Sequence, residues 1–259
     1  MRILIAEAKT MTGCNGPVTP AAALAHTPAL DAAATALMAE WSRWSAADIA
    51  LTLKISPAMA SDFLLMAREF PDKAHGSAAI EAFTGVVFKA FDYRSLNAAE
   101  KERVAGAVNI ISSAYGWRRA DDIIKRYRLD FTPRMAPDDL SMAAYWKPQA
   151  TRLLIESMQA AAETEILDLL PADAAKCIDR AAVVKAGIHF CKVDFRTVSG
   201  TSLRTPHSTL LKTLRGRLLR DIIRHNITSL ADVATFEGES MTAAPGSDPQ
   251  QGTITFLTA

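Results

Sequence analysis

The chain has 259 residues, 49% of them hydrophobic, and a formal net charge of +1 at pH 7. This length and composition fit one globular domain, residues 1–259. The balanced charge excludes a protein that coats nucleic acid through a basic surface, so an anion site must be local. The sequence contains no run of about 18 apolar residues and its first residues predict no signal peptide, so we expect a monomeric cytoplasmic protein without a membrane segment.

The N-terminal half of the sequence begins with a strand and continues mainly as helix. Residues 2–6, "RILIA", form the apolar run that is typical of a buried strand. Helices are predicted at 29–44, 46–54, 57–69 and 98–114, and a strand at 86–93, "VVFKAFDY".

The C-terminal half mixes the two kinds of element. Strands are predicted at 165–170, at 187–198 and in the last apolar alternation, "GTITFL". A helix is predicted at 206–225, with Thr205 as its N-cap and Pro206 as its first residue. Strands and helices therefore alternate along the whole chain, which predicts a mixed α/β (α+β) domain with a mixed sheet flanked by helices.

The helix at 206–225 is amphipathic, with one charged residue on its apolar face. Leucine and isoleucine side chains gather on one face, and Arg217, Arg220 and Arg224 lie roughly opposite. Arg215 falls within the apolar face. A guanidinium stays protonated and is costly to bury without a partner, so we expect Arg215 to face an anion site or a carboxylate.

The segment 46–69 is a candidate helix-hairpin-helix element. Ser56 suits an N-cap and Pro57 the first position of the second helix, so the two helices would be joined by a tight turn. In DNA-binding hairpins of this kind the backbone N–H groups hold a phosphate, which would place Lys54 and Ser56 at the contact. A plain helical hairpin is the alternative.

Two further segments carry groups that suit anion binding. Lys9 and Thr10 follow directly after the first strand, where ligand sites of α/β sheets lie. In "SSAYGWRRADDIIKRYRLDF", residues 112–131, tyrosines are interleaved with arginines, as in surfaces that stack bases and contact phosphates. The alternative is that both segments are solvated surface.

No common catalytic or metal motif is present. The sequence lacks a Gly-rich dinucleotide or phosphate loop, a nucleophile elbow and the zinc-protease and zinc-deaminase patterns. Cys14, Cys177 and Cys191 form no metal-ligand spacing, and neither do the histidines. We therefore expect reduced thiols, no metal and no cofactor.

Five segments in order resemble the YaaA peroxide-stress protein family from end to end. They are "LIAEAKT", "FTGVVFKAF", "SSAYGWRR" with "RYRLDF", "YW" at 145–146 and "KTLRGRLLRDIIRHN". The resemblance implies a single mixed α/β domain with a helix-hairpin-helix element and a positively charged cleft. It also implies binding to double-stranded or branched DNA and protection against hydrogen peroxide by limiting free intracellular iron.

The resemblance extends to individual polar residues. Matching positions are Lys9, Thr10, Tyr115, Gly116, Arg119, Tyr127, Arg128, Lys212, Arg215, Gly216, Arg220 and Asn226. We expect the cleft to be lined by Lys9, Thr10, Tyr115, Arg119, Tyr127, Arg128, Lys212 and Arg215. We expect DNA phosphates to contact Lys54, Ser56, Arg118, Arg217, Arg220 and Arg224.

Two departures from the family pattern favour another function for the cleft. "SPAKT" of the family is "AEAKT" here, which places Glu7 beside the anion site, and Asp168 replaces a family asparagine. The alternative is an enzyme for a small anionic substrate, a nucleotide or an amino acid, with candidate catalytic residues Lys9, Tyr115, Asp168, Lys212 and Arg215. In a third interpretation the protein is a scaffold and Arg215 closes an internal ion pair.

Overall fold

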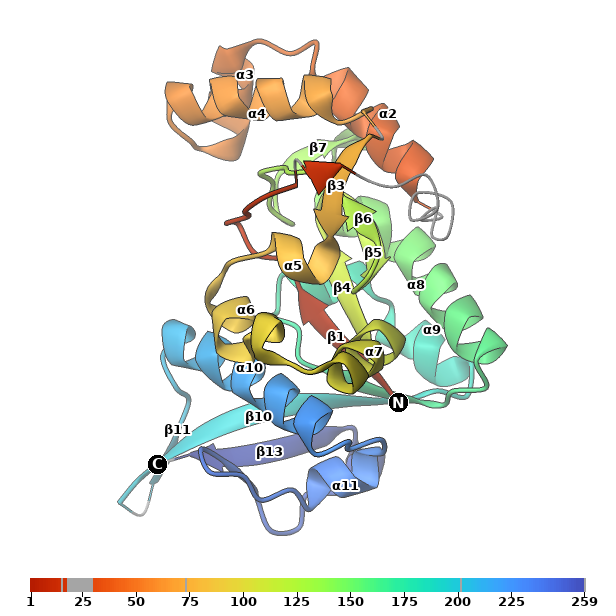
Figure 1. The fold of residues 1–259 in the computed structure, drawn as a ribbon, viewed down its shortest axis with the longest axis vertical. Helices are drawn as coiled ribbons and strands as arrows, with labels where there is room; N and C mark the ends of the chain where they lie inside the picture. Colours follow the sequence, from red (N-terminus) through yellow and green to blue (C-terminus); the bar gives the residue numbers. More distant parts are fainter. Residues whose placement is uncertain (15, 18–29, 73, 201, 259) are drawn as a thin grey trace.

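The first predicted strand, β1 (Arg2–Ala6), lies inside the main sheet, and all five of its residues are buried (Figure 1). The computed structural model describes residues 1–14, 16–17, 30–72, 74–200 and 202–258. Within these ranges the main sheet has eight strands, in the order β12-β13-β10-β9-β1-β4-β5, with β11 paired to β10. Such complete burial is typical of a parallel strand that is covered on both faces.

The centre of this sheet is parallel and its edges are antiparallel. β13, β10, β9, β1 and β4 run in the same direction, while β12, β11 and β5 are antiparallel to their neighbours. The strands besides β1 are β4 (Val108–Ser112), β5 (Gly116–Arg119), β9 (Glu165–Asp168), β10 (His189–Ser199), β11 (Ser202–Arg204), β12 (Thr242–Ala243) and β13 (Thr253–Thr258). Short strands outside this sheet are β2 (Gly16–Pro17), β3 (His75–Ala78), β6 (Ile123–Ile124), β7 (Arg134–Ala136) and β8 (Leu140–Ser141).

Two groups of helices flank the sheet (Figure 1). α10 packs on α6 and α7, and on the other side α8 packs on α9. These helices are α6 (Val86–Phe91), α7 (Ala98–Ala107), α8 (Met142–Ala160), α9 (Arg180–Lys185) and α10 (Ser208–Arg224). Shorter helical segments are α5 (Ala79–Ala82), η1 (Tyr93–Ser95), η2 (Pro137–Asp139), η3 (Ala174–Cys177), α11 (Leu230–Ala234) and η4 (Pro249–Gln251). The predicted mixed α/β domain with a flanked sheet is confirmed.

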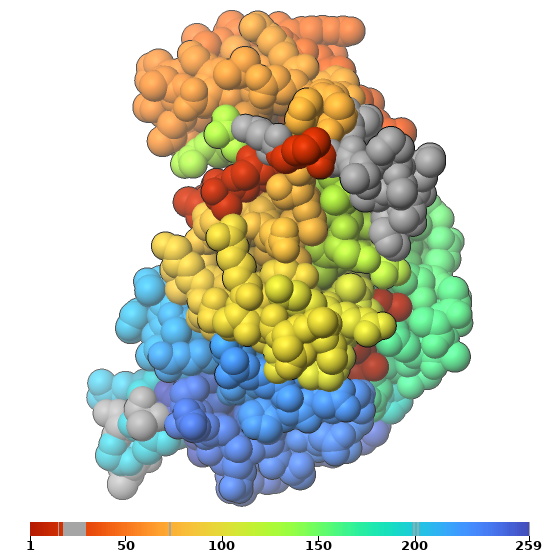
Figure 2. Space-filling model, viewed as in Figure 1, coloured from red at the N-terminus to blue at the C-terminus, as the bar shows by residue number. Residues whose placement is uncertain are grey.

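A helical hairpin forms one end of the long axis of the molecule. It consists of α3 (Ala46–Leu53) and α4 (Pro57–Glu69), and it packs on α2 (Asp31–Trp41). The space-filling view in Figure 2 shows this end projecting beyond the rest of the protein. No single helix of the described residues is long and apolar enough to cross a membrane; α3 and α4 meet that test only together, as a pair bent by 109°.

Three predicted elements differ in the structure. Residues 86–93, predicted as a strand, contain helix α6, because α10 packs closely on this segment. The predicted helix 98–114 ends at Ala107 and continues as β4, whose residues pair with β1. The predicted helix 206–225 starts at Ser208, and its N-cap is His207 rather than Thr205. The first residue of the predicted helix 29–44 lies outside the described residues.

The close packing of α6 on α10 depends on a glycine. A Cβ atom at Gly216 of α10 would lie 2.2 Å from the carbonyl oxygen of Val87 and 2.7 Å from Cβ of Ala90. Only hydrogen fits at that distance, so Gly216 lets the backbones of the two helices approach. This contact fixes the position of the basic side chains of α10 relative to the sheet.

Candidate functional site

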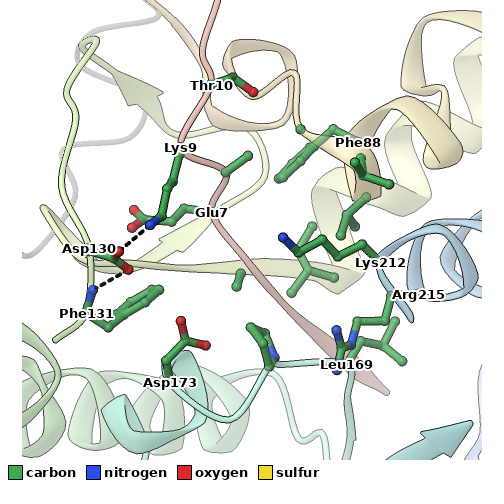
Figure 3. A pocket seen from close by; sticks show the side chains of 17 residues that line it. Glu7, Lys9, Thr10, Phe88, Asp130, Phe131, Leu169, Asp173, Lys212 and Arg215 are labelled. Carbon is green, nitrogen blue, oxygen red and sulfur yellow. Dashed lines mark hydrogen bonds and ion pairs between the residues drawn. The ribbon is translucent and has the colours of Figure 1, made fainter. Parts of the chain in front are cut away.

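A pocket of about 340 Å³ lies beyond the carboxyl ends of β1 and β9 (Figure 3). From β1 the chain proceeds to β4 on one side, and from β9 it proceeds to β10 on the other. The gap between β1 and β9 is therefore a point where the strand order reverses, and ligands of open α/β sheets bind at such points. The lining comes from 5–10, 85–88, 130–131, 169–173 and α10.

Glu7 supplies a fixed acid at this pocket. One carboxylate oxygen accepts hydrogen bonds from the backbone N–H of Ser113, at 2.9 Å, and from the hydroxyl of Tyr127, while the other accepts one from the Ser113 hydroxyl. Tyr127 in turn shares a 2.7 Å hydrogen bond with Ser112. Burial raises the pKa of Glu7 to about 7, although these hydrogen bonds act to lower it. Glu7 can therefore gain or lose a proton near neutral pH.

The opposite wall is basic. Lys212 and Arg215 reach into the pocket from α10, one turn apart (Figure 3). Arg215 is partly buried, and burial lowers the pKa of its guanidinium, while the charges of Asp168 and Asp173 act in the opposite direction. Among the described residues neither Lys212 nor Arg215 makes a hydrogen bond or an ion pair. The apolar face of the helix thus directs a cation into a pocket, not into a sealed core.

The other charged residues of the lining already make contacts within the protein. Lys9 forms an ion pair with Asp130 (Figure 3), so its ammonium is not a free nucleophile. Asp173 accepts a 3.0 Å hydrogen bond from the N–H of Ala174 at the start of η3. Thr10 lies at the rim, beside Gly85, where a Cβ atom would come within 2.5 Å of Cβ of Ala8. The glycine therefore holds α6 against the segment that carries Lys9 and Thr10.

Asp168, the predicted catalytic carboxylate, lies just behind the pocket. It is 5% exposed, and one of its oxygens accepts a 2.8 Å hydrogen bond from the N–H of Leu170. Burial raises its pKa to about 6, while the cations Arg180, Lys192 and Arg215 lower it. Its charge supports Arg215 at longer range, although it is not part of the lining.

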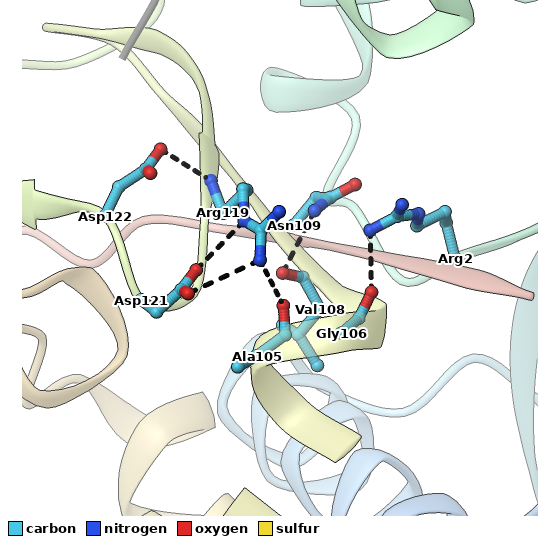
Figure 4. A network of polar contacts seen from close by, with 8 residues as sticks. All are labelled: Arg2, Ala105, Gly106, Val108, Asn109, Arg119, Asp121 and Asp122. Carbon is cyan, nitrogen blue, oxygen red and sulfur yellow. Dashed lines mark hydrogen bonds and ion pairs between the residues drawn. The ribbon is translucent and has the colours of Figure 1, made fainter. Parts of the chain in front are cut away.

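Several residues predicted for the cleft lie elsewhere. Tyr115 is 2% exposed, and its hydroxyl accepts a 2.9 Å hydrogen bond from the N–H of Lys125, so it is a core residue. Tyr127 contacts the pocket only through Glu7. Arg119 pairs with Asp121 at 3.1 Å near the end of α7 (Figure 4). Arg128 is partly buried and outside the lining.

The residues predicted to contact DNA fall into two groups. Lys54 and Ser56 lie in the exposed turn between α3 and α4, where Ser56 caps α4 and Pro57 follows, as predicted. Arg217 and Arg224 are exposed on α10.

The guanidinium groups of the other two predicted contacts lie against groups of the protein itself. Arg118 is buried, 4.3 Å from the ring centre of Tyr115 and 3.5 Å from Asp31. Arg220 donates hydrogen bonds to the carbonyls of Phe91 and Asp92 and to Ser95, at 2.7–3.0 Å. Neither guanidinium is available to a duplex, because each is held by groups of its own chain.

Sequence reasoning missed the acidic half of the pocket. The sequence marks Glu7 only as a departure from the family pattern, and it does not single out Asp130 or Asp173. For Glu7 the signal was present, since it follows a buried strand at the position where Lys9 and Thr10 were selected. Nothing local marked Asp130 or Asp173, because each reaches the pocket through a loop.

The arrangement can bind a small anion and exchange a proton. Lys212 and Arg215, which have no partner among the described residues, suit a carboxylate or phosphate, and Glu7 can act as acid or base near neutral pH. Phe88, Phe131 and Leu169 supply apolar walls. No group of three or more His, Cys, Asp or Glu side chains in the described part of the chain is arranged to hold a metal ion.

Comparison with known proteins shows similarity to one protein family along nearly the whole chain. A family profile described as peroxide stress protein YaaA matches residues 1–245. The UPF0246 protein of Phocaeicola vulgatus is 27% identical over 248 residues, which cover 95% of each chain. The UPF0246 protein of Shewanella sp. (strain ANA-3) is 28% identical over 245 residues, or 92% of this chain and 91% of the relative.

Proposed function

The chain belongs to the peroxide stress protein YaaA family, and from this premise we propose that it acts in the cytoplasm in defence against hydrogen peroxide, with the pocket as its working site. The pocket binds a small anionic ligand between α10 and the ends of β1 and β9. The family resemblance implies that the protection limits free intracellular iron, so both peroxide survival and free iron are the cellular readouts.

Arg215 is the observation that carries this proposal. A partly buried guanidinium without an ion pair or hydrogen bond from the described residues is costly for a folded protein. The cost is offset when an anion binds, since charge-assisted hydrogen bonds to a carboxylate or phosphate are the strong ones. Lys212, one turn earlier on the same helix, adds a second cation.

Binding of inorganic phosphate and acetate to the purified protein tests the proposal. We expect saturable binding that Arg215→Met and Lys212→Met each weaken at least about tenfold, which corresponds to one strong polar contact. Arg204→Met is the matched control, because Arg204 is an exposed arginine of β11 that lies outside the pocket lining and outside the predicted DNA contacts. Absence of binding, or equal loss in the control, contradicts the proposal.

The same variants test whether the pocket is needed for peroxide defence in the cell. In a strain that lacks the gene, the wild-type protein and Arg204→Met should restore survival in hydrogen peroxide and keep free iron low, whereas Arg215→Met should not. Full protection by Arg215→Met, present at wild-type level, would show that the pocket plays no part in peroxide defence.

DNA binding through the α3–α4 turn is a second candidate, favoured by the conformation of Lys54. Its φ of 53° is the left-handed conformation that glycine usually provides, so this turn reaches a glycine-like geometry without glycine. The N–H groups of Met59 and Ala60 donate to Ser56, so the N–H of Ala58 at the start of α4 would then hold a phosphate, as in DNA-binding helical hairpins. Arg217 and Arg224 would add phosphate contacts on α10.

A gel-shift series at rising salt tests this second candidate. Binding should fall steeply with salt, with a slope of about −0.9 for each phosphate contact. Ser56→Glu should weaken it, and Ser61→Glu, which adds the same charge one turn further along α4, is the control. No shift at low salt, or equal effects of the two substitutions, would exclude this turn as the contact.

A further inference from the structure

The pocket has a basic wall and an acidic wall that face each other. Lys212 and Arg215 come from α10, whereas Glu7 follows β1 and Asp173 follows β9 (Figure 3). Lys9 and Asp130 neutralise each other within their ion pair. The charges left for a ligand are therefore two cations on one side and two carboxyl groups on the other.

Glu7 keeps capacity for a ligand although it is held by the protein. A carboxylate offers about four acceptor positions. Ser113 uses one on each oxygen, and Tyr127 uses a second on Oε2, so a position on Oε1 stays open. Because Glu7 lines the pocket, a donor on the ligand can reach it.

Charge balance favours a ligand that carries both signs. With Glu7 ionised, the lining holds the cations Lys9, Lys212 and Arg215 and the same number of carboxylates, Glu7, Asp130 and Asp173. A plain anion then leaves its charge uncompensated in a partly desolvated site, and it brings a proton onto Glu7. A ligand with an anionic group and an ammonium group leaves the balance intact.

We infer that the ligand of this pocket is a small zwitterion, with its carboxylate or phosphate at Lys212 and Arg215 and its protonated amine at Glu7 and Asp173. An α-amino acid is the simplest such molecule, and the walls formed by Phe88 and Phe131 suit an apolar substituent. This inference rests on the proposed anion site and adds the amine that selects among anions.

Two pairs of probes that differ only in the amine test the inference at pH 8, above the pKa of about 7 of Glu7. The carboxylate pair is L-leucine and 4-methylpentanoate, and the phosphate pair is phosphoethanolamine and ethyl phosphate. We expect the amine-bearing member of at least one pair to bind at least about tenfold more tightly, the size of a charge-assisted hydrogen bond. Calorimetry measures each affinity.

The variant Glu7→Gln tests whether Glu7 causes the preference for the amine. The variant should lose most of the preference for the amine, and its affinity for the plain anion should stay the same or rise, because Lys212 and Arg215 are unchanged and the lining has lost one negative charge. Its thermal melting confirms that it is folded. Asp62→Asn, which removes an exposed acid of α4, should leave both affinities unchanged.

The sign of proton exchange is an independent readout. Calorimetry at pH 7 in two buffers of different ionisation heat should show proton uptake with 4-methylpentanoate and proton release with L-leucine. The charged or titratable groups that surround Glu7 are Lys9, Asp130, Asp173, Lys212, Arg215, Tyr127 and Cys177. Glu7→Gln should abolish both signals.

The outcomes separate the two proposals. If phosphate and acetate bind but the amine gives no gain in either pair, or neither pair binds, the zwitterion inference is wrong and the anion site stands. If the preference for the amine survives Glu7→Gln, the acidic wall does not select the ligand. If no anion of any kind binds, the proposed function fails as well.

Discussion

Replacing Glu7 by glutamine should change how the stability of the protein depends on pH. Burial raises the pKa of Glu7 from its ordinary 4.5 to about 7 in the folded protein. Below pH 4.5 the folded and unfolded chains both hold the proton. Between pH 4.5 and 7 only the folded chain keeps it, so the free energy of unfolding falls as the pH rises. Above pH 7 the loss is complete.

The size of the effect follows from the two pKa values. At about 1.4 kcal/mol for each pH unit, the wild-type protein loses about 3 kcal/mol over this window through Glu7 alone. Glutamine carries no proton to lose, and its amide can keep a hydrogen bond with Ser113. The free energy of unfolding of Glu7→Gln, minus that of the wild type, should therefore rise by about 3 kcal/mol between pH 4.5 and 7.

Urea unfolding at half-unit steps from pH 4.5 to 8 measures this difference, and subtraction removes the contribution of other acids that both proteins share. Asp62→Asn is the control for the loss of an acid as such, because Asp62 is exposed on α4. A difference between Glu7→Gln and the wild type that stays constant over the whole range would refute the reasoning, since Glu7 would then titrate alike in both states.

Residues in the pocket and in the elements around it give further predictions for the same unfolding measurement. Arg215→Met should leave the free energy of unfolding unchanged or raise it, because it removes a partly buried charge that makes no ion pair or hydrogen bond with the described residues, whereas a loss of about 3–5 kcal/mol would reveal a sealed ion pair. Gly216→Ala should cost about 1–3 kcal/mol, because its Cβ would lie 2.2 Å from the Val87 carbonyl oxygen, while Gly106→Ala on α7, with nothing within 4 Å, should gain up to about 1 kcal/mol; equal effects would contradict the close packing of α6 on α10. Asp168→Asn should remove a loss of stability that lies between pH 3.8 and 6, because burial raises the pKa of Asp168 over that interval, and an unchanged pH profile would argue against its burial.

Sequence reasoning predicted the elements whose local pattern agrees with their tertiary setting. The apolar run of β1, the N-cap of α4 at Ser56 and the amphipathic face of α10 needed no knowledge of other segments. It failed at 86–93, because the apolar residues of this segment fit a strand equally well and only its packing on α10 selects a helix. Tertiary contacts therefore decided the element that local pattern left ambiguous.

The candidate site was predicted in part for the same reason. Lys9, Thr10, Lys212 and Arg215 all line the pocket, since two follow a buried strand and two lie on one stripe of a helix. Arg118 and Arg220 are predicted as DNA contacts, one from arginines interleaved with aromatic residues and one from the polar face of its helix. In the structure Arg118 is buried against a tyrosine ring, and backbone carbonyls hold the partly buried Arg220. Such partners come from distant parts of the chain and leave no local pattern.

Glu7 connects two segments that resemble the family, those with Tyr115 and Tyr127, to the pocket. The sequence predicts Tyr115 and Tyr127 in the cleft, but in the structure both lie behind the residues that line the pocket. Ser113 and Tyr127 hold the Glu7 carboxylate, and Tyr115 packs edge-on against Tyr127 at 5.7 Å. An acid at the position after a buried strand is costly unless such donors surround it. Ser113 and Tyr127 supply such donors and hold the Glu7 carboxylate at the pocket. We therefore expect the pocket to select anions that also carry an ammonium group.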